Sequence, residues 1–473
     1  MRLAHLPSTL LLAAMITAPR VPAQQPTAPP AASARALPSD DEILSIIRQR
    51  VQEKRSAGIV VGVIDPDGRQ RIVSYGDAGP GQPPLDANTV FEIGSISKVF
   101  TATVLAQMVQ EGKIRLDDPA QKYLPSGVRL PTRGDKVITV GSLSEQNSGL
   151  PRMPANFHPA NPQNPYADYS VQQMYEFLSG YSLARDPGAQ FEYSNLGVGL
   201  LGHILSRVSG QSYEELERSR VWAPLGMTHT GIAMTDSMKA HLALGHDEQG
   251  NVVSNWDLPT LAGAGAIRST MSDMLRFLDA NLHPERGPLQ QAMAFAHKER
   301  APAGNMGIGL NWLSLHAGAD TIVWHNGGTG GYRSFIGFVP SRKAGVVILT
   351  NSTGAGADDI GFHLLNSSLP LAPAPKPPTE RKAIVLPQEV LGRYVGTYQL
   401  ASGLRLDVAL VDSALYIHPA QQATLRLWPS SEVDFFVKEL DAQFTFVRDT
   451  KGFVTGLVLH QGGEDAPAPK VVP

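Results

Sequence analysis

One proline-dense segment, LAPAPKPPTE at residues 371–380, divides this chain of 473 residues. Proline lacks an amide hydrogen and fixes its φ angle, so neither a helix interior nor a central strand tolerates this density of prolines. The sequence also changes character there, because helix-like and strand-like runs mix before the segment and only short strand-like runs follow it. We therefore expect two folded parts, residues 39–370 and 385–473, joined by a semi-rigid linker at 371–384.

The first part has the pattern of an α/β domain. Ser39 and Glu42 form a capping-box pattern that predicts an opening helix. Two β-branched runs joined by the turn sequence DPDG, residues 65–68, predict a hairpin. Further strand-like runs lie between residues 306 and 351, and the middle reads as helices at 99–111, 170–179, 196–209 and 271–282. The expected fold is α/β, an antiparallel sheet flanked by helices, with strands from both ends of the part and a helical insertion.

The second part, residues 385–473, consists of short alternating runs separated by Asp, Ser and Gly turns. Alternation with a period of two predicts strands, so we expect a small all-β barrel-like domain or a sandwich. No cluster of catalytic residue types occurs in it. A stabilising appendage and a gate over substrate access both remain open as its role.

The N-terminus has the pattern of a secretory signal. Residues 1–23 have a basic start, an apolar run from Leu10 to Ile16 and a small-residue site that predicts cleavage near Ala23. The apolar run is too short to span a membrane, and a disordered tail on a non-exported protein is the alternative. Residues 24–38 form a Pro/Ala-rich spacer. The chain has no cysteine, which excludes disulfides and thiolate catalysis and fits export to a bacterial periplasm or the cell exterior.

The overall charge limits the class of partner. A formal net charge of -3 and a pI near 6.5 provide no basic field for nucleic acid or an anionic membrane. We expect a small-molecule or short-peptide substrate, and the oligomeric state stays open. His241, His246, Asp247 and Glu248 lie close together, but GHDEQGN is typical of a hairpin turn and no zinc motif is present, so we expect no metal. With no P-loop or dinucleotide fingerprint, we expect no cofactor.

The stretch FEIGSISKVF, residues 91–100, places Ser95 and Lys98 three positions apart where a strand-like run gives way to a helix-like one. A serine nucleophile needs a base within hydrogen-bond reach and donors for the developing oxyanion. At a helix start the two side chains share one face, and the helix N-terminus adds N–H groups. Lysine acts as a base only when neutral, so burial or a nearby cation must lower its pKa. Taken alone, the pattern is more often a helix-start serine with a surface lysine.

Two later motifs supply further polar groups. FEYSNLG contains Tyr193 and Asn195, which one loop can turn to the same side; a phenol relays protons, and an amide orients substrate and lysine. TIVWHNGG ends a strand-like run with His325, Asn326 and Gly327, and glycines at a strand edge let a substrate backbone approach closely. Each motif alone is also typical of an ordinary turn.

Serine with lysine, Tyr-x-Asn and His-x-Gly, in this order over about 230 residues, resemble the serine hydrolase family of class C β-lactamases, DD-peptidases (penicillin-binding proteins) and related esterases. The resemblance covers roughly residues 40–365, including SGLP and HNGGTGGYRS, and the second part resembles modules appended to some members. It implies a role for each matching residue. Ser95 is the expected nucleophile, Lys98 and Tyr193 share the acid/base work, and the substrate is oriented by Asn195, His325, Asn326 and Gly327. The expected oxyanion hole consists of the backbone N–H groups of Ser95 and Gly328.

Two departures from the family pattern limit the functional prediction. The β-lactamases usually carry Lys-Thr-Gly as the third motif, whose lysine supplies a fixed cation for the substrate carboxylate, whereas His325 and Asn326 stand here. Histidine is only partly charged near neutral pH. We therefore expect a D-amino-acid peptidase, carboxypeptidase or esterase acting through a Ser95 acyl-enzyme on amide or ester bonds. A β-lactamase and a slowly deacylating penicillin-binding receptor remain as alternatives. Gln146 replaces the histidine that relatives commonly carry, so we assign its loop no chemistry.

Overall fold

The computed structural model describes residues 36–354, 356–374, 381–400, 404–419, 424–438, 442–461 and 464–471. The chain divides into two compact units, Met1–Ala372 and Pro373–Pro473. The predicted signal peptide, most of the predicted spacer and residues 375–380 of the predicted linker lie outside the described residues. Within those ranges, no helix is long and apolar enough to cross a lipid bilayer.

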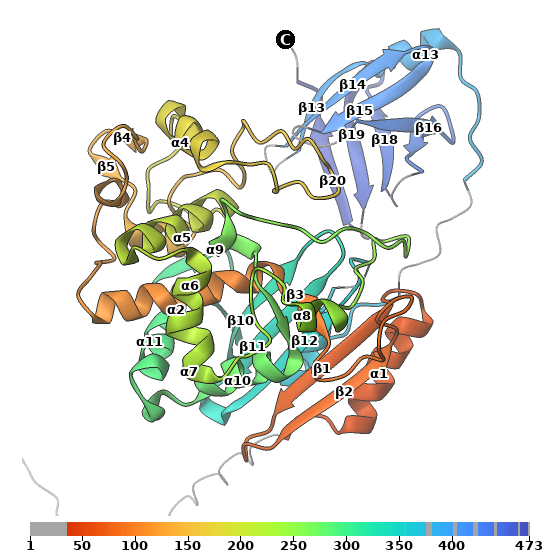
Figure 1. Ribbon diagram of the computed structural model, residues 1–473. Coiled ribbons are helices and arrows are strands. Elements are labelled where there is room, and N and C mark those ends of the chain that lie inside the picture. Colours follow the sequence, from red (N-terminus) through yellow and green to blue (C-terminus); the bar gives the residue numbers. More distant parts are fainter. Residues whose placement is uncertain are drawn as a thin grey trace, which may run out of the picture. The chain divides into compact units, whose positions relative to one another are not determined.

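An eight-stranded antiparallel sheet forms the centre of the first unit (Figure 1), in the order β2-β1-β12-β11-β10-β9-β8-β7. Its strands are β1 (Gly58–Ile64), β2 (Gln70–Gly76), β7 (Ala301–Ala303), β8 (Met306–Ile308), β9 (Leu313–Ala317), β10 (Asp320–Gly328), β11 (Arg333–Val339) and β12 (Ala344–Thr350). The predicted hairpin β1–β2 pairs through β1 with β12, so the sheet joins the two ends of the unit as the sequence predicted.

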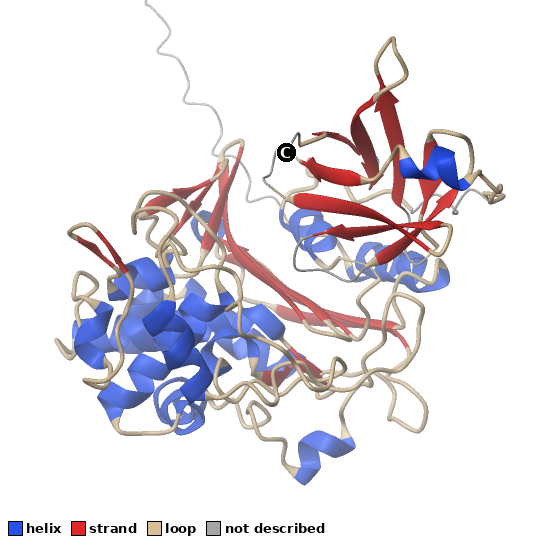
Figure 2. Cartoon of the chain, turned by 90° about the horizontal axis from the view of Figure 1, so that it is seen from above, coloured by secondary structure: helices blue, strands red, loops and turns tan. Residues whose placement is uncertain are grey.

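Helices cover both faces of this sheet (Figure 2). The opening helix α1 and the late helix α12 pack on one face, and α10 with the helical region packs on the other. The longer helices are α1 (Asp40–Gln52), α2 (Ser97–Gln110), α4 (Val171–Gly180), α5 (Asn195–Ser209), α10 (Met271–Leu282), α11 (Pro288–His297) and α12 (Asp358–Leu365). The shorter ones are α3 (Val140–Ser144), α6 (Tyr213–Glu217), α7 (Ala223–Leu225), α8 (Asp236–Ala240) and α9 (Ala262–Gly265). The α/β prediction and its helical insertion are confirmed.

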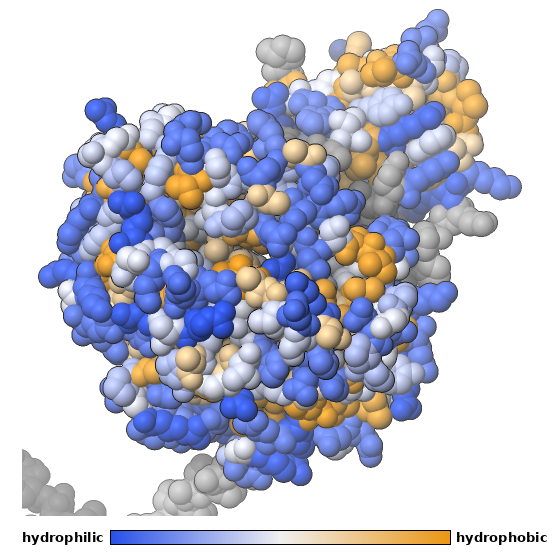
Figure 3. Space-filling model, viewed as in Figure 1, coloured by the Kyte–Doolittle hydropathy of each residue, from blue (hydrophilic) through white to orange (hydrophobic). Residues whose placement is uncertain are grey.

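Both faces of the sheet are buried, which explains the continuous β-branched runs in its central strands. Along β1, Ile59, Val61 and Val63 join the core beneath α1 and α12. The intervening Val60 and Ile64 join the core of the helical region. On the face shown in Figure 3, hydrophilic side chains cover most of the first unit, because its apolar residues are collected in these two cores.

The sheet meets the helical region most closely where β10 ends beside a 3-10 turn, Gly94–Ile96, that precedes α2. A Cβ atom on Gly327 would overlap the carbonyl oxygen of Ile93, and one on Gly94 would lie 2.6 Å from the amide nitrogen of Gly328. Gly94 also has a positive φ of 50°, which favours glycine. Two glycines therefore let the strand end and the turn approach backbone to backbone.

The second unit is an eight-stranded antiparallel meander in which each strand pairs with the next along the chain. A short helix, α13 (Gln388–Gly392), precedes its strands, and a bridge between Tyr398 and Lys470 links the first strand to the segment after the last, giving a nearly closed barrel. The predicted barrel-like domain is confirmed. The strands are β13 (Gly396–Gln399), β14 (Arg405–Val411), β15 (Ala414–Pro419), β16 (Leu425–Pro429), β17 (Asp434–Phe436), β18 (Ala442–Arg448), β19 (Val454–Gln461) and β20 (Glu464–Pro469).

Replacing Gly327 by alanine is expected to destabilise the first unit, because the added methyl group has no space between β10 and the turn at Ile93. Overpacking of this kind costs about 1–3 kcal/mol. The urea midpoint of Gly327→Ala should therefore fall well below that of Gly127→Ala, the matched control, since a Cβ on Gly127 meets nothing within 4 Å. Equal midpoints for the two variants would contradict the backbone-to-backbone contact.

Candidate active site

Ser95 lies in the 3-10 turn between β3 (Val90–Glu92) and α2. Its neighbours Gly94 and Ile96 are buried, whereas Ser95 is partly exposed, so its hydroxyl opens toward solvent. The turn continues into α2, which carries Lys98 one turn further on, and the amine Nζ of Lys98 lies 2.9 Å from the Oγ atom of Ser95. The sequence-predicted contact between these two side chains is present.

Lys98 is fully buried. Besides Ser95 Oγ, its Nζ atom contacts the Oδ1 atom of Asn195 at 2.8 Å and the carbonyl oxygen of Ala264 at 2.7 Å. Burial holds the pKa of Lys98 well below its ordinary value, and the positive charge of Arg152 acts in the same direction. A lowered pKa is the direction of shift that a serine-activating base requires.

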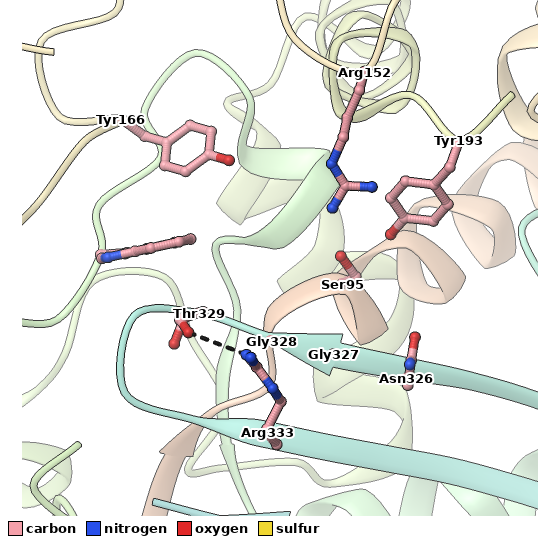
Figure 4. Close-up of a pocket in the computed structure, with 10 residues that line it drawn as sticks. Ser95, Arg152, Tyr166, Tyr193, Asn326, Gly327, Gly328, Thr329 and Arg333 are labelled. Atoms are coloured by element: carbon pink, nitrogen blue, oxygen red, sulfur yellow. Dashed lines mark hydrogen bonds between the residues drawn. The ribbon is translucent and has the colours of Figure 1, made fainter. Parts of the chain in front are cut away.

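Tyr193 and Asn195 lie where a loop enters α5, whose N-cap is Ser194. The phenol of Tyr193 points toward Ser95 in Figure 4, and the Lys98 amine lies 4.8 Å from the centre of its ring. Burial raises the pKa of Tyr193 to about 12, although a hydrogen bond with Ser95 and the charge of Arg152 oppose that rise. Tyr193 is therefore a protonated phenol at neutral pH.

The end of β10 brings the third motif beside the same turn. His325 is buried with its ring centre 6.3 Å from that of Tyr193, and its Nδ1 atom donates to the carbonyl of Asn326 at 2.6 Å. Burial lowers the pKa of His325 to about 3, so the ring is neutral. The amide nitrogen of Asn326 donates to Asp358 on α12 at 2.6 Å. That donor is therefore already engaged within the protein.

A cavity of about 560 Å³ opens beside Ser95 (Figure 4). Its lining includes Ser95, four other residues that the sequence predicted and five that it did not. His325 is not among the described residues that line it. The lining residues are Ser95, Arg152, Tyr166, Tyr193, Trp256, Asn326, Gly327, Gly328, Thr329 and Arg333.

The missed residues come mainly from loops. Arg152 directly follows the SGLP sequence that supported the resemblance, which is the one signal that would have found it. Its guanidinium lies 5.0 Å from the centre of the Tyr193 ring, and its backbone carbonyl accepts the N–H of Asn195 at 3.0 Å. Tyr166 and Trp256 face each other with ring centres 5.3 Å apart and form one wall. No periodicity in their loops marks them in advance.

Gln146, to which the sequence assigned no chemistry, brackets Tyr193. Its backbone carbonyl accepts the N–H of Glu192 at 2.6 Å, and its Oε1 atom accepts the N–H of Ser194 at 2.7 Å. The Nε2 atom donates to Asn311 at 3.0 Å, and Gln146 itself has a left-handed φ of 57°. One buried residue therefore fixes the backbone on both sides of the phenol, through its own backbone carbonyl on one side and its side-chain amide on the other.

Metal ligation has no support in the part of the chain that the structure describes, where no three or more His, Cys, Asp or Glu side chains are grouped to hold an ion. The residues considered for a metal form a turn instead. His246 pairs with Val252 across it, and its Nδ1 atom lies 3.0 Å from the carbonyl oxygen of Asn351.

Comparison with known proteins gives two matching family models. The model described as beta-lactamase matches residues 43–365. A domain of unknown function named DUF3471 matches residues 380–469, the region of the barrel.

Relatives of this chain have two kinds of name. A protein from Pseudomonas fluorescens named beta-lactamase is 31% identical over 360 residues, covering 69% of this chain and 97% of that protein. An Escherichia coli K12 protein named D-alanyl-D-alanine-carboxypeptidase/endopeptidase AmpH is 30% identical over 317 residues, covering 63% of this chain and 80% of that protein. A solved class C beta-lactamase structure superposes with a TM-score of 0.61 at 25% identity, covering 69% of this chain and 96% of that one.

Replacing Gln146 by methionine is expected to lower kcat on an acyl substrate about 10- to 100-fold, because the backbone around Tyr193 loses its side-chain acceptor and misplaced groups slow catalysis on this scale. KM should change much less, which a purely structural defect would not produce. Gln146→Glu keeps the acceptor oxygen and should retain more of the activity. Gln110→Met, on the exposed end of α2, serves as the control. An unchanged kcat in Gln146→Met would exclude the positioning role.

Replacing Arg152 by glutamine removes a positive charge that helps to keep the Lys98 pKa low. A base is active when deprotonated, so with Lys98 as the expected base, activity rises with pH through the pKa of Lys98. The pKa should increase in this variant, and the acid limb of the kcat/KM profile should move to higher pH. Arg152→Lys retains the charge and should keep the limb in place. A limb at the same pH in all three proteins would show that the charge of Arg152 does not act on the base.

Proposed function

Because this chain belongs to the β-lactamase family and is related to class C β-lactamases and DD-carboxypeptidases, we propose that it hydrolyses amide or ester bonds through an acyl-enzyme on Ser95. Its first expected substrates are D-amino-acid peptides or esters. The observation that carries the proposal is the environment of the Lys98 amine.

A neutral amine has two hydrogens and one lone pair. Two of the three neighbours of Lys98 Nζ, Asn195 Oδ1 and the Ala264 carbonyl, can only accept hydrogen bonds. In a neutral Lys98 they take both hydrogens, so the lone pair faces the third neighbour, the hydroxyl of Ser95 at 2.9 Å. This arrangement supports Lys98 as the base that takes the serine proton.

The proposed reaction begins when Ser95 Oγ attacks the substrate carbonyl carbon and its proton passes to Lys98. The bond to the leaving group then breaks, and the leaving group receives a proton from Tyr193, which Lys98 restores. Deacylation runs through the same steps in reverse. Water gives a proton to the Tyr193 and Lys98 pair and adds to the acyl carbon, and the bond to Ser95 Oγ then breaks as the serine recovers its proton from Lys98. The raised pKa of Tyr193, about 12, supports the role of a proton donor at this step.

The proposed oxyanion hole uses the backbone N–H groups of Ser95 and Gly328. Their proximity follows from the glycine contact, since the amide nitrogen of Gly328 lies beside Gly94, the residue before the nucleophile. Backbone donors held between a strand and a helix need no reorganisation as negative charge develops, and the loss of one such donor typically costs about a hundredfold or more in rate.

The choice among substrates rests on the third motif. The two relatives have nearly equal identity and different names, so their similarity favours neither β-lactams nor peptides. His325 is neutral and buried and supplies no fixed cation of the kind that lysine provides in β-lactamases. This supports peptidase, carboxypeptidase or esterase activity over a dedicated β-lactamase. A slowly deacylating penicillin-binding receptor is a further outcome that the test below detects.

We also propose that the protein is exported after cleavage near Ala23, which rests on the sequence of residues 1–23. We further propose that residues 39–370 and 385–473 form two domains with a linker between them. The barrel is proposed as an appended module without catalytic residues.

Intact mass measured over time for residues 24–473 mixed with a penicillin tests the function. A lasting adduct that maps to Ser95 and is absent in Ser95→Ala supports the acyl-enzyme with slow deacylation, as in a peptidase or receptor. Rapid loss of the drug without a lasting adduct indicates a β-lactamase. Ester or D-alanyl peptide hydrolysis that disappears in Ser95→Ala, without any reaction with penicillin, indicates the esterase or peptidase. Full hydrolysis by Ser95→Ala would overturn the proposal.

A further inference from the structure

The third motif lacks the lysine that β-lactamases usually carry there, yet the cavity contains other positively charged side chains. His325 is buried and its pKa is about 3, so it stays neutral at any ordinary pH. The described residues that line the cavity include two guanidinium groups, those of Arg152 and Arg333, and no carboxylate. A cavity with this lining favours an anionic ligand.

The two arginines differ in position. Arg152 is exposed, lies over the Tyr193 ring and acts on the pKa of Lys98, so its charge is tied to the base. Arg333 is half-buried and is the first residue of β11, next to the strand end that carries the third motif. In Figure 4 it lies beside Gly328, on the other side of the cavity from Arg152.

Arg333 lies against Gly328, its direct partner in the β10–β11 pair. The guanidinium uses the space that a side chain would fill, because a Cβ atom on Gly328 would be 2.5 Å from Nη1 of Arg333. The charge therefore stands beside a backbone N–H that is proposed to hold the oxyanion. A carboxylate bound there would be only a few atoms from the carbonyl under attack.

The guanidinium has little to satisfy it within the protein. Its Nη1 atom donates two long hydrogen bonds of 3.4 Å, to the backbone carbonyls of Thr329 and Tyr332. Burial lowers the pKa of Arg333, while Glu248 and Asp358 act on it in the opposite direction from a distance. Across the described ranges no carboxylate comes within the 4.0 Å of an ion pair with it, and Asp358 already accepts from Asn326.

We propose that Arg333 is the carboxylate anchor of this site and that the protein selects substrates whose leaving group carries a carboxylate close to the scissile bond, such as peptides with a free C-terminus. The inference rests on the proposed function and narrows it, since neutral esters would lack the anchored group. A charged, hydrogen-bonded contact of this kind gives both orientation and selectivity.

The test compares two acyl esters that differ only in the leaving group, 3-carboxyphenol or phenol. The wild-type protein should prefer the 3-carboxyphenyl ester, and the ratio of the two kcat/KM values should fall about 10- to 100-fold in Arg333→Gln. Arg333→Lys keeps the charge without the planar fork and should retain part of the preference. Arg129→Gln, an exposed arginine outside the cavity, is the matched control and should retain all of it.

Binding measured in the Ser95→Ala background separates this inference from the proposed function. Calorimetry should show that an N-acetyl peptide ending in D-alanyl-D-alanine binds more tightly than its C-terminal amide. Arg333→Gln or Arg333→Lys should reduce that difference, whether or not turnover is found. A difference that stays the same in folded variants of Arg333, or that disappears in Arg152→Gln instead, would overturn the assignment to Arg333.

Discussion

The buried amine of Lys98 is the constraint on which the rest of the first unit depends. A buried charge without a counter-ion is costly, and a lysine avoids the cost by releasing its proton. Three helices must then pack in register around one nitrogen atom, since α2 carries the lysine, α5 begins with Asn195, and α9 supplies the carbonyl of Ala264. The large apolar core of the helical region holds these helices rigidly enough for hydrogen bonds of 2.7 to 2.9 Å.

The helices supply only half of the site, and the other half is the end of β10. Close approach of these halves requires the absence of side chains at Gly94 and Gly327. The proposed reacting group would therefore be held between two backbones, each belonging to a rigid element. Other residues that line the cavity surround this fixed centre. Arg152 and Trp256 lie in loops, and Arg333 lies where a strand begins.

The helices and strands could be predicted from the sequence, and so could the contacts that local geometry determines. The 3-residue spacing of Ser95 and Lys98 across a helix start gives their contact directly, and β-branched runs give the strands on either side of the insertion. The sequence was insufficient for groups placed by loops, because the paths of loops follow from long-range packing that no periodicity records. Gln146 is the clearest case. We assign it no chemistry of its own, and its contacts appear only when its loop and the loop around Tyr193 are seen together.

The order of the strands has a consequence for when the protein becomes chemically competent. Strand β12, ending at Thr350, lies between β1 and β11, so the sheet cannot form completely until the last of its eight strands has been synthesised. Contacts this distant in sequence form slowly and late. A nascent chain that lacks β10 contains Ser95 and Lys98 but not Gly328, whose N–H is the second proposed oxyanion donor. On the proposed mechanism, the catalytic site is complete only when the whole first unit has folded.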